Sequence, residues 1–483
     1  MERKEPLNIL VLGAGISGLC AAWNLVQDGH RVIVLEKKSY CGGLGSTFQR
    51  GGYRYDLGPH NIHSQKESVV DFLKKNFAAD FFKHKFFAQI YFRKQRIDYP
   101  ITGKDVLVSI NYLTAISCMF SFLFARFRSL FIPKFRDDGS YENWIINRFG
   151  RKFYNIYFAP YSEKVWKMPA NQISDIVAKK RIVITGIIEL IHSIIFRRQR
   201  YHPENPRTVN NYYFQYGVGA ISDFFLKGIT DLGGEVITDS EVEEIIVEGD
   251  FVRKVSYVRN GKTENLNLGN EDSCSSWRLL STIPINEMIM KIKGDIPEAV
   301  KAAAENLDFT SEVLLYLNVN KPDIFKVPLL YFSEPEFPFN RGYDLGIFSR
   351  KMVPEGKNAL CLEVTCEYGD QIWNMSDSAL FEKCIEILEK HKLLNRVEVE
   401  EYHTRRLEHA YPRFRVGYEK NLNMLFEYIN NVHNLISFGR QGLFSYSNID
   451  DAIWMGFTVA KDVGYHDRIR LSMKELLPDY ISF

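Results

Sequence analysis

The stretch from residue 7 to residue 36 constrains the fold more than any other part of this sequence. An apolar run at 7–12 leads into the turn Gly13-Ala14-Gly15-Ile16-Ser17-Gly18, and a helical pattern and a second apolar run at 31–35 follow. This order of strand, glycine turn, helix and strand is typical of a nucleotide-binding βαβ unit, in which a pyrophosphate lies on the N-terminus of the helix. Glu36 ends the second strand, where a carboxylate can accept hydrogen bonds from ribose hydroxyls.

The residues of the turn have separate expected roles. Gly13 makes the tight turn, Gly15 lets the backbone approach a pyrophosphate, and Gly18 lets the helix pack closely on the strand. Ser17 lies in the first turn of the same helix. We therefore predict a dinucleotide cofactor in contact with these four residues and with Glu36.

Two further glycine-rich segments follow the acidic residue. They are Cys41-Gly42-Gly43-Leu44-Gly45-Ser46 and the stretch from Gly51 to His60. Together with the βαβ unit they resemble the flavin-binding proteins of the amine oxidase, protoporphyrinogen oxidase and UDP-galactopyranose mutase superfamily. The resemblance implies FAD rather than NAD as the cofactor, and it adds Lys37 and Gly43 to the predicted cofactor contacts.

Composition narrows the class of protein. The chain has 483 residues, of which 46% are hydrophobic and 25% charged, and this fits a globular protein of two or three domains. A formal charge of +2 and the lack of a nucleic-acid motif argue against a nucleic-acid partner. The seven cysteines show no metal-like spacing, and Cys361 and Cys366 fall at odd separation in one expected strand, so we predict neither a metal site nor a disulfide framework.

Two apolar runs, at 106–125 and 182–196, interrupt this globular pattern. Serines, Asn111 and Thr114 weaken the case that the first run crosses a membrane, and the second has only 15 residues. Basic residues flank both runs. A buried helical subdomain, peripheral membrane contact through 106–136 and 182–198, and a true span therefore all remain open. The first expected strand begins almost at once, with no room for a cleaved signal peptide, so we expect a cytoplasmic protein, with the inner face of the membrane as the alternative.

An aromatic segment lies between the two apolar runs. Tyr161-Ser162-Glu163-Lys164-Val165-Trp166 resembles a Tyr-Ser/Thr-x-Lys-x-Trp pattern of UDP-galactopyranose mutases and of bacterial protoporphyrinogen oxidase-like proteins. In those proteins the tyrosine and the tryptophan help to line the substrate cavity. The resemblance implies this role for Tyr161 and Trp166.

The cofactor site is expected to resume twice later in the chain. Strands at 235–237, 241–248 and 252–259 are predicted to form a meander, and the resemblance implies that Val242 contacts the adenine. A buried strand at 434–440 precedes a helix that ends near 463, and Asn448 or Asp450 is expected to cap this helix toward the flavin. The superfamily pattern adds these residues to the cofactor site: Gly439, Arg440, Asn448 and Asp450.

Gly58-Pro59-His60 resembles the Gly-Pro-His of bacterial UDP-galactopyranose mutases, in which the first histidine lies beside the flavin. His60 is therefore the predicted catalytic residue, because an imidazole can donate a proton to a developing charge near neutral pH. By the same resemblance, Arg440 is expected near the flavin and a substrate phosphate. Tyr446 is predicted to bind substrate.

The sequence also departs from the mutase pattern. The strand at 309–317 carries no arginine, whereas mutases have one there, and Phe444 and Asn448 stand in place of a tyrosine and an aspartate. Losing a bidentate arginine weakens diphosphate binding by about 1.5–3 kcal/mol. Arg405, Arg413 and Arg415 are possible replacements. Glu367 and Asp370 are carboxylates that we predict to be solvated or structural.

The sequence thus predicts an α/β fold, in which a Rossmann-like FAD-binding domain is interleaved with a mixed α+β substrate domain and a helical subdomain. The expected segments are 1–98, 205–290 and 411–483 for the FAD-binding domain, 99–204 for the helical subdomain and 291–410 for the substrate sheet. The predicted function is an FAD-dependent, protoporphyrinogen oxidase-like oxidoreductase that transfers a hydride to flavin N5 from a sugar- or isoprenoid-linked small molecule, either a nucleotide-sugar or a lipid-linked compound. The alternatives are a UDP-sugar mutase that uses reduced FAD as nucleophile and a non-catalytic flavoprotein.

Overall fold

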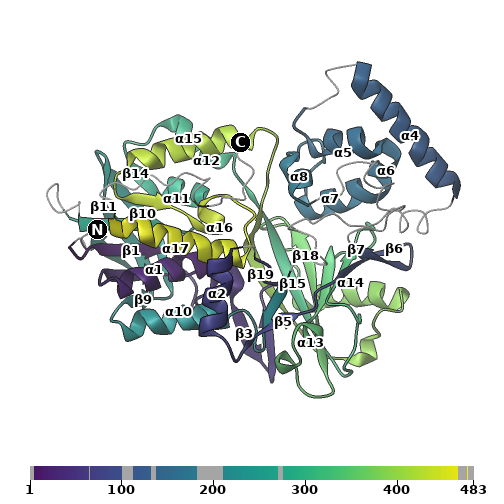
Figure 1. The fold of residues 1–483 in the computed structure, drawn as a ribbon, viewed down its shortest axis with the longest axis horizontal. Coiled ribbons are helices and arrows are strands. Elements are labelled where there is room, and N and C mark those ends of the chain that lie inside the picture. The colour runs from purple at the N-terminus through teal and green to yellow at the C-terminus, as the bar shows by residue number, and fades with distance from the viewer. Residues whose placement is uncertain are drawn as a thin grey trace.

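The computed structural model describes residues 5–64, 66–99, 112–131, 138–181, 210–269, 276–465 and 476. Figure 1 shows two sheets side by side, each with helices packed on it, and a separate group of helices beyond the second sheet. The predicted membrane-contact run at 182–198 lies outside the described residues.

The first sheet is the parallel sheet of the nucleotide-binding domain. Its strands read as continuous apolar runs because both faces of the sheet are buried, Val11 and Val34 in one hydrophobic core and Leu10, Leu12 and Leu35 in another. The helices α1 (Ile16–Gln27), α10 (Ala220–Asp231) and α17 (Ile449–Tyr465) pack together beside it. In spatial order the strands are β20 (Leu435–Ser437), β13 (Trp277–Ser281), β1 (Asn8–Leu12), β2 (Arg31–Leu35) and β9 (Glu235–Ile237).

The second sheet has seven strands and is largely antiparallel. One face of its central strands packs toward the nucleotide-binding domain through Leu314, Tyr316 and Cys361. The other face forms a separate core with α14 (Asp377–Lys390). In spatial order the strands are β19 (Val399–Pro412), β15 (Phe309–Val319), β18 (Asn358–Cys366), β17 (Arg341–Asp344), β16 (Leu329–Phe332), β6 (Ala88–Phe92) and β7 (Gln95–Tyr99).

Smaller sheets complete the nucleotide-binding side. The predicted turn at Asn260-Gly261 is present with φ of 52° and 72°, as a type I′ hairpin requires. The predicted meander is only partly correct, because β9 joins the parallel sheet instead. The remaining strands are β12 (Lys262–Asn267), β11 (Phe251–Arg259), β10 (Ser240–Glu248) and β14 (Ile292–Gly294) in one sheet, and the pairs β3 (Thr47–Arg50) with β4 (Tyr53–Asp56) and β5 (Phe81–His84) with β8 (Asn211–Phe214).

The helical subdomain lies at one end of the molecule (Figure 1). Within the described part of the chain, no helix is both long enough and apolar enough to cross a bilayer. The subdomain consists of α4 (Tyr112–Phe131), α5 (Tyr141–Phe149), α6 (Arg151–Phe153), the π-turn η3 (Tyr154–Phe158), α7 (Ala159–Trp166) and α8 (Ile176–Arg181).

The predicted α/β class with a Rossmann-like domain is confirmed. The sheet pairing places β6 and β7 in the substrate sheet, although the expected first cofactor segment reached residue 98. Cys361 and Cys366 face opposite sides of their strand, as their odd separation predicted. The other helices are α2 (Glu67–Asn76), α11 (Ile285–Lys291), α12 (Glu298–Glu305), α13 (Leu345–Phe348), α15 (Tyr418–Asn431), α16 (Gly439–Gly442) and the short turns η1 (Gly43–Gly45), η5 (Arg350–Met352) and η6 (Arg396–Glu398).

Candidate cofactor and substrate site

The glycine turn after β1 has the shape that a pyrophosphate requires. A Cβ atom added at Gly18 would lie 2.2 Å from the carbonyl oxygen of Gly13, and one added at Gly13 would lie 2.5 Å from Thr282 Oγ1. At Gly15 an added Cβ meets nothing within 4 Å. Neighbouring atoms leave no room for a side chain at Gly13 or Gly18. Gly15, in contrast, borders open space at the N-terminus of α1. This cradle fits a bound dinucleotide.

Glu36 is held against this turn at the end of β2. One of its carboxylate oxygens accepts a hydrogen bond from the Ala14 N–H and the other from the Lys38 N–H, both at 2.8 Å. Burial raises the pKa of Glu36, and these hydrogen bonds oppose the rise. The carboxylate is thus positioned beside the turn, where the resemblance places a ribose.

Lys37 and Val242 are two further residues that are predicted to contact the cofactor. The Lys37 ammonium group lies 3.1 Å from Glu241 and 3.8 Å from Glu408, in ion pairs that are half-exposed. Val242 is buried in β10. Their contacts with the cofactor stay predictions.

Segments from opposite ends of the chain meet at the glycine turn. The Gly42 N–H donates to the Ala14 carbonyl at 2.7 Å, and a Cβ added at Gly43 would lie 3.3 Å from Gly15 Cα. From the C-terminal side, Gly439 lies so close that its added Cβ would be 3.2 Å from Ser17 Cβ. The structure therefore brings the first and last predicted cofactor segments together.

The start of α17 has a cap formed by two residues. The Ala452 N–H donates to the Asn448 carbonyl at 3.0 Å, and the Asn448 N–H donates to Asp451 Oδ2 at 2.9 Å. Asn448 therefore stands at the predicted cap position, with Asp451 closing the cap. Asp450 is buried near Lys66, and burial raises its pKa to about 6.

His60 is half-buried beside this cradle. Its Nε2 atom lies 2.9 Å from the Leu44 carbonyl and 3.2 Å from the Leu57 carbonyl, so Nε2 carries the hydrogen. Burial, with a smaller contribution from the charges of Arg440 and Arg341, lowers the pKa of His60 to about 4. The imidazole is neutral near pH 7, and its hydrogen is used to hold the loop. Its catalytic role stays a prediction, with Nδ1 as the available nitrogen.

An aromatic cluster collects the three predicted substrate residues with two others. Trp166 contacts Tyr411 edge-on at 6.2 Å between ring centroids, and Tyr411 stacks on Tyr446 at 5.5 Å. Tyr161 contacts Tyr331 at 6.0 Å. We name these five residues the aromatic cluster. The Arg440 guanidinium lies 4.7 Å above the Tyr446 ring and joins the cluster to α16.

The structure places an arginine in this cluster that the sequence interpretation missed. Arg341, on β17, donates from Nη2 to the Tyr411 hydroxyl at 2.5 Å and from Nε to the Glu363 carboxylate. Burial lowers the pKa of Arg341, but the charge of Glu363 together with the neighbouring tyrosines outweighs this and holds the pKa above its usual value. Arg341 therefore supplies a cation from β17 where β15 has none.

The three arginines suggested as replacements are engaged elsewhere. Arg413 and Arg415 form ion pairs with Asp308 at 3.0 and 2.8 Å, and Arg413 also pairs with Glu367 at 2.8 Å. The Arg405 guanidinium lies 4.4 Å above the Phe48 ring.

The carboxylates that were predicted to be structural have such roles. Glu367 is exposed and pairs with Arg413 at 2.8 Å. Asp370 accepts the backbone N–H groups of Glu367 and Trp373 at 3.0 and 2.7 Å and thereby closes a turn.

Two other carboxyl groups lie inside the sheet next to Arg341. Glu312 on β15 and Glu363 on β18 are 3% and 0% exposed, and the charge of Glu363 acts on Glu312. Two like charges in one buried site disfavour the ionised form of both groups, which favours a proton on Glu312. Burial, followed by the charge of Glu363, raises the pKa of Glu312 well above its usual value.

The carboxyl pair lies against the segment that carries His60. A Cβ added at Gly58 would lie 3.9 Å from Glu363 Oε1, an oxygen that has no hydrogen-bond donor among the described residues. The sequence did contain a signal for both residues, because each is a single glutamate within a continuous apolar strand, Phe-Thr-Ser-Glu-Val-Leu-Leu and Leu-Cys-Leu-Glu-Val. A charged residue in a fully buried strand requires a partner.

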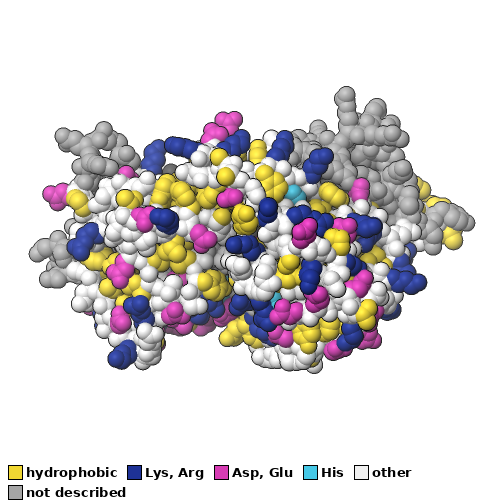
Figure 2. Space-filling model, turned by 90° about the horizontal axis from the view of Figure 1, so that it is seen from below, with side chains coloured by type: hydrophobic (Ala, Val, Ile, Leu, Met, Phe, Trp, Pro, Cys, Tyr) yellow, Lys and Arg dark blue, Asp and Glu magenta, His cyan; other side chains and the backbone are white. Residues whose placement is uncertain are grey.

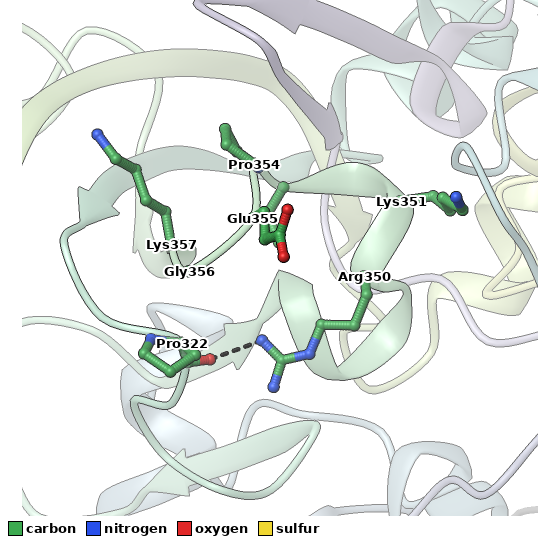
Figure 3. Close-up of a pocket in the computed structure, with 8 residues that line it drawn as sticks. Pro322, Arg350, Lys351, Pro354, Glu355, Gly356 and Lys357 are labelled. Atoms are coloured by element: carbon green, nitrogen blue, oxygen red, sulfur yellow. Dashed lines mark hydrogen bonds between the residues drawn. The ribbon is translucent and has the colours of Figure 1, made fainter.

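A hollow elsewhere on the surface is separate from this site. It has a volume of about 500 Å³ and is bordered by Pro322, the turn at 353–357 and η5 (Figure 3). The Arg350 guanidinium crosses it to donate to the Pro322 carbonyl at 2.7 Å. None of the predicted site residues lines it. The underside of the molecule likewise mixes basic and acidic side chains without a field of one sign (Figure 2).

Comparison with known proteins supports the predicted class. Residues 11–75 match the family model of the NAD(P)-binding Rossmann-like domain, which covers the βαβ unit that NAD and FAD proteins share. A UDP-galactopyranose mutase from Mycoplasma genitalium is 26% identical over 202 residues, which are 38% of this chain and 45% of that protein. A 1-hydroxycarotenoid 3,4-desaturase from Flavobacterium sp. strain P99-3 is 35% identical over 85 residues, 15% of this chain and 17% of that protein. The chain thus aligns with less than half the length of these relatives.

Similarity to solved structures extends over the whole chain. The crystal structure of a reduced UDP-galactopyranose mutase has a TM-score of 0.79 at 20% identity and covers 98% of this chain and 97% of its own. A protein from Exiguobacterium sp. 255-15 assigned as a protoporphyrinogen oxidase has a TM-score of 0.69 at 14% identity, with 96% and 99% covered. The chain thus shares its fold with a UDP-galactopyranose mutase, with the protein assigned as a protoporphyrinogen oxidase and with a putrescine oxidase. The predicted fold is confirmed, and FAD stays the predicted cofactor.

Proposed function

We propose that the protein is an FAD-dependent oxidoreductase that removes a hydride from a carbon of a sugar- or isoprenoid-linked small molecule bound at the aromatic cluster. The observation that carries this proposal is the Glu312–Glu363 carboxyl pair, which is buried beside Arg341 and against the Gly58-Pro59-His60 segment. Bound FAD supplies the hydride acceptor, as it does throughout such flavoenzymes.

The carboxyl pair can take the proton that such an oxidation releases. When a C–H bond of an alcohol carbon breaks, its electron pair leaves as hydride, the O–H bond gives up a proton and a C=O bond forms. With one proton on Glu312, the pair retains one negative charge and can accept a second proton. The net charge of the pair and Arg341 together then rises from zero to plus one, and a reduced, anionic cofactor would balance that charge.

The charges of the site also favour oxidation over diphosphate binding. A substrate diphosphate needs cations whose charge is not already compensated and whose N–H groups are not already donating to other acceptors. Arg341 is compensated by Glu363, and Arg440 donates from Nη1 and Nη2 to the carbonyls of Ser447 and Ala410 at 2.7 and 3.0 Å. The aromatic cluster offers ring faces that suit a sugar ring or an isoprenoid chain.

A flavin-dependent UDP-sugar mutase is the second candidate. Arg341 favours it, because this residue places a second arginine near Arg440 and Tyr446, where the sequence pattern had seemed to lack one. In this function reduced FAD would serve as the nucleophile, and there would be no net oxidation of the substrate.

Anaerobic mixing with candidate sugar-linked and isoprenoid-linked alcohols tests the proposal. Bleaching of the flavin together with a product that has two hydrogen atoms fewer is the expected result. Conversion of UDP-galactose to an isomer by the reduced enzyme, without bleaching or net oxidation, would replace oxidation by the mutase function. Purified protein without a flavin spectrum would overturn both.

The carboxyl pair is tested separately by the Glu312→Gln variant. Loss of a positioned acid–base group lowers the rate by roughly 10²–10⁴-fold. We expect bleaching to slow within this range while the flavin spectrum is retained. Glu367→Gln, which changes an exposed carboxylate, is the matched control and should leave the bleaching rate unchanged. An unchanged rate in Glu312→Gln would remove the pair from the reaction.

A further inference from the structure

Helix α4 distributes its side chains in the opposite way to an ordinary surface helix. Of the 16 large apolar side chains that are exposed in the described part of the chain, eight lie on this helix of 20 residues. Six of the eight are more than half exposed: Leu113, Phe120, Leu123, Phe124, Phe127 and Phe131. With Ile116, they recur along the helix at spacings of three and four residues (113, 116, 120, 123 or 124, 127 and 131), so they form a continuous apolar face.

The opposite side of α4 packs through small side chains. Cys118 and Ala125 are buried, and the Ser121 hydroxyl accepts the Lys152 N–H at 3.0 Å. The backbone at Phe122 approaches Gly150 so closely that an added Cβ there would lie 2.6 Å from the Phe122 nitrogen. The helix is therefore attached to α5 and α6 by its small residues, while its largest apolar residues point outward.

The segment of the sequence that contains α4 is strongly basic. The helix has no acidic residue, and it carries Arg126, which is exposed, and Arg128. Residues 99–204 contain 16 lysines and arginines against 8 acidic residues, whereas the whole chain has 61 against 59. The rest of the chain is thus net acidic. The excess positive charge is concentrated in the segment that also exposes the apolar face.

We propose that α4 docks on the surface of a lipid bilayer that contains anionic lipids. A helix with a wide apolar face and basic residues beside it lies in the plane of the interface, with its apolar side chains among the acyl chains. Among the described residues no helix meets the requirements for a span, which leaves the interface as the depth of insertion. Figure 1 shows α4 at the outer end of the molecule, away from both sheets, and the apolar side chains of this face are exposed.

Charge decides between a bilayer and a second copy of the chain. Two copies meeting through α4 would bring two basic subdomains together, and like charges oppose that contact. Anionic headgroups complement the same charges, and each lysine or arginine near such a surface contributes about 1 kcal/mol. The apolar face and the basic residues beside it therefore both favour an anionic bilayer as the partner.

Sedimentation with lipid vesicles tests this proposal with the flavin-loaded protein. We expect the protein to bind vesicles of phosphatidylcholine with phosphatidylglycerol at low salt, and to bind pure phosphatidylcholine vesicles more weakly. The double variant Phe120→Ser/Phe124→Ser should bind at least ~10-fold more weakly, because two large apolar side chains no longer insert. Arg126→Gln, which leaves the apolar face intact, should weaken binding by about 5-fold, with a reduced dependence on salt.

Exposed apolar residues elsewhere are the matched controls. Leu232→Ser and Val397→Ser remove such side chains outside the helical subdomain and should leave vesicle binding unchanged. Failure of the wild-type protein to bind anionic vesicles, or equal binding by the double phenylalanine variant, would overturn the proposal. A change of oligomeric state in that variant, without vesicle binding by the wild type, would identify the face as an interface between copies instead.

Discussion

Strand β15 and helix α4 both depart from the usual distribution of side chains, and they do so in opposite directions. The strand buries Glu312 within a core of apolar residues, next to Glu363 and Arg341. The helix exposes its phenylalanines and buries small side chains such as Ala125. One element carries charge where burial makes charge costly, and the other carries apolar area where water makes it costly.

The two departures differ in how the protein compensates for them. Inside the sheet, Arg341 forms an ion pair with Glu363, and the raised pKa of Glu312 favours its neutral form, so the cost is met within the molecule. At α4 the apolar face is exposed among the described residues, and we propose a lipid bilayer as the partner that covers it. Departures of the first kind indicate a chemical site, and departures of the second kind indicate a binding surface.

Removing the balancing cation should have the largest effect on stability. In Arg341→Met the carboxylate of Glu363 loses its buried partner, and breaking a buried ion pair costs about 3–5 kcal/mol. Urea unfolding monitored by circular dichroism measures the change. Arg350→Ala, which breaks an exposed pair with Asp323, is the control and should cost less than about 1 kcal/mol. Equal losses in the two variants would contradict the buried balance of charge.

The orientation of α4 can be tested with two neighbouring residues. Ala125→Leu places a large side chain on the packed face and should destabilise the protein by about 1–3 kcal/mol. Phe124→Ser changes the exposed face and should leave the free energy of unfolding within about 0.5 kcal/mol of the wild type. The same unfolding measurement compares them. The reverse order of effects would mean that the phenylalanine face, and not the small-residue face, is packed.

The proton on Glu312 should appear in the pH dependence of stability. The raised pKa of Glu312 means that the folded state binds more protons than the unfolded state at pH values between the two pKa values. Its stabilising contribution is complete below the unfolded pKa of about 4.3 and is lost as the pH rises toward the folded pKa. Glu312→Gln removes this loss, so its stability should fall less with rising pH, by up to about 1.4 kcal/mol per pH unit.

Other buried carboxyl groups provide the background for that measurement. Burial raises the pKa of Asp56 and of Asp344 to about 6, and both titrate in the wild type and the variant alike. Only the difference between the two stability curves therefore reports on Glu312. Parallel curves from pH ~5 to ~8 would show that the pair holds no extra proton in the folded state.

Local patterns explain what could be predicted from the sequence. The glycine turn and the position of Glu36 depend on residues within one βαβ unit, so spacing alone located them. The hairpin at Asn260-Gly261 is local in the same way. Tyr161, Trp166, Tyr446 and Arg440 were found through their resemblance to known motifs, and the structure brings all four to the aromatic cluster.

The tertiary structure decided which charged residues share a site. Arg341, Glu312 and Glu363 lie on three strands, and only the order β15, β18, β17 in the sheet makes them neighbours. The sequence interpretation looked for the missing cation in Arg405, Arg413 and Arg415, because no local pattern indicates which arginine is already paired. It likewise could not say which face of α4 is packed, because burial depends on contacts with Gly150 and Lys152.

The sequence by itself thus determined the class of cofactor, since a cradle for a pyrophosphate is built from consecutive residues. The chemistry that accompanies the cofactor was decided by the fold. Buried charges acquire their partners and their pKa values only when distant strands pair. The apolar face of a helix becomes a binding surface only when the opposite face of that helix is packed against the protein.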